Sequence, residues 1–265
     1  MDLLSPARTG NLAALCRFAD AGASINQANT KKETPLIVAA SAGFLDICQY
    51  LLSRRARLDL ARSDGATALF CAAQGNHVRV CQLLVDRGAN VELALEDGTK
   101  PLHIASQLGH TSICSLLLSN GANVHATRKD GVTALYLASA QGHVETSRVL
   151  LRHGAEVGGV AGSGTDSLAL ITAAIARSVG CCRLLLEHGA SVNTRCKNGT
   201  SVLHYAVMYG SVAVCELLLH NGANTELRTM KKVTPLITAS FYGHGTSSTL
   251  ISSISHTLKK MFLRY

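Results

Sequence analysis

The sequence predicts an all-α repeat solenoid, built from short helix-turn-helix units that stack and that each project a β-hairpin finger. One observation is a tripeptide, usually ending in Gly-Ala, that begins at residues 21, 54, 87, 120, 153, 188 and 221. Its spacing is 33 residues five times out of six, and 35 residues once. A second string, TPLIVAA at 34–40, recurs in the same register in most copies. Because one such unit cannot bury its apolar faces alone, the copies must stack.

Each repeat is expected to begin with a short helix at the second string. In TPLIVAA the proline stands in the first turn, where its missing N–H costs no hydrogen bond. A glycine with positive φ then ends the helix, at Gly43, Gly109, Gly142, Gly210 and Gly243. Asn76 takes that place in the third repeat, and Arg177 and Ser178 stand there in the sixth.

A second helix is expected to follow, as in VRVCQLLVDRG, where apolar residues recur at helical spacing and a glycine stops the helix. In the remaining segment of each unit, such as NVELALEDGTK, apolar and polar residues alternate before a turn sequence. This pattern predicts an extended hairpin finger that reaches toward the next repeat.

These landmarks divide the chain into a repeat domain, residues 1–244, and a divergent helix or tail, residues 245–265. The repeats span about 1–30, 31–63, 64–96, 97–129, 130–162, 163–197, 198–230 and, in part, 231–244. The sixth repeat's first helix is expected to gain two residues, and the preceding finger, 157–164, contains four glycines. A hinge there would separate repeats 1–5 from repeats 6–8.

The strings described above, together with Asp-Gly at 64, 97 and 130 and Gly-His at 109, 142 and 243, resemble the ankyrin repeat. The resemblance covers about residues 1–244. It implies a protein-interaction module whose partners sit on the face made by the fingers and the first helices. It also implies structural hydrogen bonds for six histidines: His77, His103, His110, His143, His204 and His244.

The nine cysteines are explained mostly by the repeat. One position in the second helix is cysteine in five repeats, as Cys48, Cys81, Cys114, Cys182 and Cys215, and is Leu15 or Ser147 in two others. A position that accepts these residues needs a small, mostly apolar filler, which is what a buried free cysteine is. Stacked helices lie about 8–10 Å apart, too far for disulfides along this column.

Two weaker interpretations concern the cysteines outside that column. A zinc site at Cys181, His188 and Cys196 is conceivable, although no CxxC pair supports it. A reactive surface thiol at Cys181 or Cys196 is the other. No motif of a hydrolase, kinase, metalloprotease or paired-carboxylate enzyme is present. We therefore expect no enzyme, no cofactor and no metal.

Positive charge gathers at the finger tips of this chain, which has a formal net charge of +8. The tip residues are Lys31, Lys32, Arg128, Lys129, Arg195, Lys197, Arg228, Lys231 and Lys232. A partner with an acidic surface would be steered to this edge with a salt-sensitive association rate. The competing interpretation is a row of solvated loop cations.

The two residues before each helix-ending glycine become large and apolar in the last repeats. They are Met208 with Tyr209 in repeat 7 and Phe241 with Tyr242 in repeat 8. Aromatic and methionine residues are enriched in binding hot spots, which makes this region the expected anchor for a partner. The competing interpretation is that the C-terminal segment folds over these residues.

The sequence thus favours an intracellular, monomeric scaffold or adaptor that binds an acidic or mixed protein, with a cytoplasmic location expected and a nuclear one left open. One alternative is the substrate-recognition subunit of a ubiquitin-ligase-type complex. Another is association of the basic edge with nucleic acid or an anionic membrane, which we expect less than a protein partner.

Overall fold

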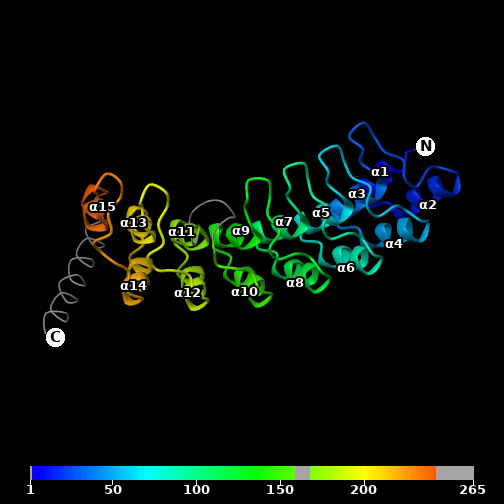
Figure 1. Ribbon diagram of the computed structural model, residues 1–265. Helices are drawn as coiled ribbons and strands as arrows, with labels where there is room; N and C mark the ends of the chain where they lie inside the picture. Colours follow the sequence, from blue (N-terminus) through cyan, green and yellow to red (C-terminus); the bar gives the residue numbers. More distant parts are fainter. Residues whose placement is uncertain (1, 159–167, 243–265) are drawn as a thin grey trace. The chain divides into compact units, whose positions relative to one another are not determined.

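The computed structural model describes residues 2–158 and 168–242, all of them helices, turns and loops apart from isolated bridges (Figure 1). Its internal contacts divide the chain into unit 1, Met1–Asp130, and unit 2, Gly131–Tyr265. The sequence placed a hinge in the finger 157–164, most of which lies outside the described residues. The observed division falls one repeat earlier.

Unit 1 contains four helix pairs. They are α1 (Leu4–Thr9) with α2 (Leu12–Asp20), α3 (Pro35–Ala42) with α4 (Leu45–Ser53), α5 (Ala68–Gln74) with α6 (Val78–Asp86), and α7 (Pro101–Gln107) with α8 (Thr111–Ser119). Each first helix contacts the next first helix, and each second helix contacts the next second helix. Two rows of helices result, and the fingers project as loops from the row that begins with α1 (Figure 1).

Unit 2 repeats this arrangement from α9 onward. Its helices are α9 (Ala134–Ala140) with α10 (Val144–Arg152), α11 (Leu168–Ile175) with α12 (Val179–Glu187), α13 (Val202–Met208) with α14 (Val212–His220), and α15 (Pro235–Phe241). Here too first helices contact first helices and second helices contact second helices. The tail expected at 245–265 lies outside the described residues.

The first helices begin where the sequence predicts. Thr34 caps α3, with its Oγ1 accepting a hydrogen bond from the N–H of Ile37 at 3.3 Å, and Pro35 occupies the first turn. Ser201 makes the equivalent cap at α13. Such caps satisfy N–H groups that a helix start leaves without a partner, and each contributes about 1 kcal/mol.

The helix-ending residues confirm the expected left-handed backbone. Gly43 has a φ of 79°, and Asn76 and Arg177, which replace glycine, have φ values of 58° and 57°. The extra residues of repeat 6 were assigned to its first helix, and this is wrong. The spacing from Ala169 to Arg177 equals that from Ala134 to Gly142, so the extra residues come before α11.

The fingers are hairpins closed by tight turns, with isolated bridges such as Arg195 to Ser201. Several of the described turns close through a side-chain oxygen, as where Asp97 Oδ1 accepts from the N–H of Thr99 at 2.8 Å. Neighbouring tips are joined through the backbone. In unit 2 the N–H of Met230 donates to the carbonyl of Asn198 at 3.0 Å. The tips of one unit therefore form a connected edge.

The five column cysteines are fully buried, as expected, and burial raises the thiol pKa of Cys48 to about 12. The alternative of a reactive surface thiol is wrong for Cys181, since its exposed fraction is 0%. Cys181 occupies the position next to the column, which Ile113 and Val214 fill in other repeats, and both of those side chains are buried as well. Its Sγ lies 3.9 Å from Ser147 Oγ of the preceding repeat.

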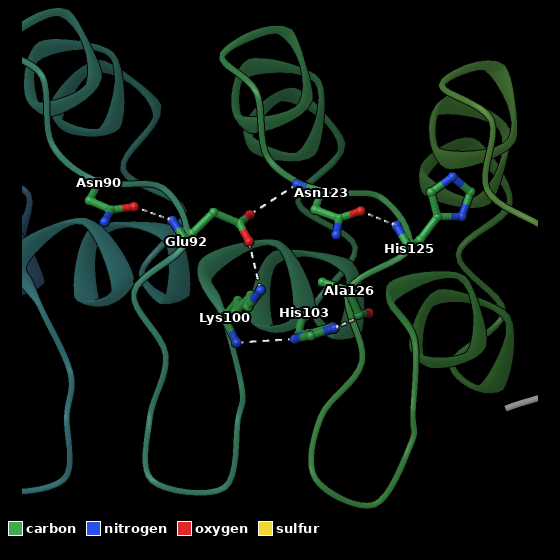
Figure 2. Close-up of polar contacts among 7 residues, drawn as sticks. All are labelled: Asn90, Glu92, Lys100, His103, Asn123, His125 and Ala126. Carbon is green, nitrogen blue, oxygen red and sulfur yellow. Dashed lines mark hydrogen bonds and ion pairs between the residues drawn. The ribbon is translucent and has the colours of Figure 1, made fainter. Parts of the chain in front are cut away.

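Polar contacts also join neighbouring repeats (Figure 2). Glu92 accepts hydrogen bonds from the N–H of Asn123 at 2.9 Å and from Lys100 Nζ at 2.6 Å. Burial alone would raise the pKa of Glu92, but these hydrogen bonds and the charge of Lys100 outweigh it and lower the pKa. Glu92 is therefore ionised, and its hydrogen bond to Asn123 links one repeat of unit 1 to the next.

His103 makes the second link in Figure 2. Its Nδ1 accepts from the N–H of Lys100 at 3.1 Å, so Nε2 carries the proton and donates to the carbonyl of Ala126 at 2.9 Å. His204 repeats this in unit 2 with Ser201 and Val233. The expected structural role is thus confirmed for both residues, and for His77 and His110, whose rings bond carbonyls of the preceding repeat. His244 lies outside the described residues.

Candidate functional site

The five column cysteines are buried, and the rings of His77, His103, His110 and His204 bond backbone carbonyls of neighbouring repeats. No group of three or more His, Cys, Asp or Glu side chains in the described part of the chain is arranged to hold a metal ion. Cys181 is buried, and His188 bonds the carbonyl of Leu184 through Nδ1 at 2.8 Å. The hypothesis of a zinc site at Cys181, His188 and Cys196 is therefore wrong, because these side chains form no such group. None of the helices within 2–158 and 168–242 has the length and apolarity to cross a membrane.

In unit 1 two tip cations, Arg62 and Arg128, are neutralised by neighbouring carboxylates. Arg62 pairs with Asp64, two residues further on. Arg128, a predicted site residue, pairs with Asp130 at 3.0 Å and approaches Asp97 at 3.9 Å. The guanidinium of Arg128 is thus already engaged by acids of its own unit, which weakens its predicted role in attracting an acidic partner.

The last two finger tips of unit 2, which the structure describes, have no acid at the turn position. Asn198 stands where unit 1 has Asp64 and Asp97, and its Oδ1 accepts the same turn-closing hydrogen bond, from the N–H of Thr200 at 3.0 Å. Lys231 occupies that position in the last finger, where Thr229 Oγ1 accepts from the N–H of Val233 instead. Both turns therefore close without a carboxylate.

Consequently the cations at these tips remain uncompensated. The side chains are Arg195, Lys197, Arg228, Lys231 and Lys232, all exposed and without an ion pair among the described residues. Lys31 and Lys32 are also exposed, but they lie in unit 1, as does Lys129. Unit 2 thus carries the larger group of unpaired tip cations.

An apolar pocket of about 660 Å³ lies between the last two fingers and the helices α13 and α15. Three of the four predicted apolar residues line it: Met208, Phe241 and Tyr242. Phe241 is 84% exposed, and its ring meets that of Tyr242 edge to face at 5.5 Å between centroids. Tyr209 is exposed but does not line the pocket.

A second pocket, of about 540 Å³, lies between the finger tips themselves and is polar. Arg195, Lys197 and Arg228 line it, and no acidic side chain does. Thr194 lines it as well, and its buried Oγ1 has no hydrogen-bond partner in the structure. Met230 belongs to both pockets, so the two sites adjoin.

Among the pocket residues that the sequence did not predict are Thr194, Met230 and Ile237. Met230 is a methionine at a turn position that is polar in the other described fingers, and its exposed fraction is 79%. That departure was a usable signal. Ile237 stands in the position of His103 and His204, which the following finger covers in their repeats, yet it is 53% exposed. Sequence position alone would assign Ile237 to the core.

Comparisons with known proteins agree with this architecture. A family model described as ankyrin repeats, in three copies, matches residues 4–94, 88–161 and 160–229. Among solved structures, the crystal structure of the human ASB11 ankyrin repeat domain is 26% identical, with a TM-score of 0.73. That match covers 83% of this chain and 98% of the other. No curated protein matched the sequence.

Proposed function

Because the chain belongs to the ankyrin-repeat family, whose domains are typically non-catalytic interaction modules, we propose that it is a protein-interaction scaffold or adaptor. Its binding site is the face of unit 2 between the fingers and the first helices. Its partner is a protein whose contacting segment carries acidic and apolar side chains. The proposal assigns no chemical step to any residue.

The observation that carries this proposal is the apolar pocket beside unpaired cations. Met208, Phe241 and Tyr242 are large side chains gathered around one concavity of about 660 Å³. Exposed aromatic and methionine side chains around a pocket are typical of binding hot spots, because their burial by a partner removes much apolar surface from water. Exposed Lys231 lines the same pocket and supplies charge at its rim.

Two alternatives differ from this proposal in the surfaces that they use. A substrate-recognition subunit of a ubiquitin-ligase-type complex would use this face for its substrate and a second surface for the ligase scaffold. Residues 245–265, which could supply that second surface, lie outside the described residues. Nucleic acid or anionic membrane would instead use the cations without needing the apolar pocket.

The test is selection of a random dodecapeptide display library on the full chain, with duplex DNA, RNA and anionic liposomes as competitors. We expect enrichment of peptides that contain both acidic and large apolar residues, and no displacement of these peptides by the competitors at near-physiological salt. Failure to enrich any peptide would contradict the proposal. Displacement by one competitor would instead favour the corresponding alternative.

A further inference from the structure

We infer that the polar pocket between the finger tips of unit 2 is a binding subsite for an oxyanion. An acidic side chain of the partner occupies it, while an apolar side chain of the same partner fills the neighbouring pocket. This inference rests on the proposed function and adds the chemistry that the partner must carry. Its ligand group is a side-chain carboxylate or the phosphate of a phosphorylated serine, since both present oxygen acceptors with negative charge.

The pocket carries positive charge. Arg195, Lys197 and Arg228 line it, and none of them forms an ion pair among residues 2–158 and 168–242. Like charges in one concavity repel one another, which costs free energy until an anion enters. The pocket is therefore electrostatically complementary to an acidic group.

The turn beside this pocket closes through an amide oxygen and carries no carboxylate. Asn198 Oδ1 closes its turn with the N–H of Thr200, as Asp97 Oδ1 does with Thr99 in unit 1. The amide keeps the hydrogen bond that the turn needs and removes the negative charge. An aspartate there would compete with a partner's acid for Lys197, the adjacent residue.

The hydroxyl of Thr194 is buried beside this pocket without a hydrogen-bond partner among the described residues. Thr194 as a whole is 4% exposed. A buried polar group left without a partner costs about 1–3 kcal/mol. A ligand oxygen in the pocket that Thr194 lines would accept a hydrogen bond from this hydroxyl and remove that cost.

The two pockets also share a wall. Thr229 and Met230 line both of them, so an acidic side chain in one and an apolar side chain in the other come from positions close together in the partner. A single extended segment or loop can supply both. This distinguishes the site from a diffuse basic surface, which would place no apolar requirement on the ligand.

The chain's own residues 243–265 fit this subsite poorly. They contain no aspartate or glutamate, whereas they include Lys259, Lys260 and Arg264. A basic segment would add to the repulsion among the pocket cations. Charge complementarity therefore favours a separate acidic partner as the occupant.

The test compares two variants of the full chain that each add one negative charge at a finger tip. Asn198→Asp places it beside the subsite and retains the turn-closing oxygen, whereas Ser63→Asp places it at an exposed tip of unit 1. The probe is the dodecapeptide of highest affinity from the library selection, measured by fluorescence anisotropy at several salt concentrations. We expect about tenfold weaker binding and a shallower salt dependence for Asn198→Asp, and less than a twofold change for Ser63→Asp.

Peptide variants complete the test. Replacing the peptide's acidic residue by alanine should weaken binding to the unmodified chain about tenfold and binding to Asn198→Asp much less, because the two changes remove the same interaction. A phosphoserine peptide measured beside the aspartate peptide tells the two oxyanions apart. Equal loss in Asn198→Asp and Ser63→Asp would overturn the subsite while leaving the proposed function intact. Absence of any selected peptide would overturn both.

Discussion

Tyr242→Asp is expected to weaken binding of the selected peptide by about a hundredfold, which corresponds to about 2.7 kcal/mol. Tyr242 lines the apolar pocket and its ring contacts that of Phe241. An aspartate there removes apolar area from the contact, leaves a charge at the pocket wall and repels an acidic partner. Isothermal titration calorimetry with the full chain measures the change.

Leu108→Asp is the matched control for this variant. Leu108 follows α7 in unit 1, as Tyr242 follows α15 in unit 2, and both are exposed, at 42% and 47%. We expect Leu108→Asp to change affinity by less than twofold. Unchanged affinity of Tyr242→Asp, together with a lowered thermal stability, would contradict the hot-spot assignment and favour coverage of Tyr242 by the chain itself.

His103→Ala is expected to lower the free energy of unfolding by about 3 kcal/mol. The substitution leaves the N–H of Lys100 and the carbonyl of Ala126 without their partner and creates a cavity where a buried ring stood. Denaturant unfolding of the full chain measures the loss. His125→Ala is the control, because the His125 side chain is exposed and points away from the bonded cluster in Figure 2. A loss of equal size in both variants would contradict the assigned role.

The same histidine predicts the direction of a pH effect. Burial lowers the pKa of His103 below its ordinary value of about 6.5. The unfolded chain therefore takes up a proton near that pH while the folded chain resists it, so stability falls as pH drops below about 6.5. The slope of unfolding free energy against pH should decrease in His103→Ala. An unchanged slope would place the titrating group elsewhere.

The regular parts of the fold could be predicted from the sequence because the same residues that begin and end helices recur in most repeats. Thr34 before Pro35 predicts a capped helix start, and Gly43 predicts its end. Cys181 was considered a surface thiol only because it lies outside the column of buried cysteines. The neighbouring position, filled by Ile113 and Val214 elsewhere, faces the core just as fully.

The candidate site could be predicted only in part. Met208, Phe241 and Tyr242 were found because large apolar residues at exposed-type positions are visible in the aligned repeats. Counting cations did not reveal that Arg128 is paired with Asp130 while Arg195 is free of such a partner. That distinction depends on side-chain geometry at the turn, which residue type alone does not determine.

The most direct test of the account is hydrogen–deuterium exchange of the full chain with and without the selected peptide. Binding at the two adjoining pockets predicts slower exchange in residues 193–200 and 228–242, with unit 1 unchanged. Protection in the fingers of unit 1, with none in these two segments, would contradict the assignment of the binding site to unit 2.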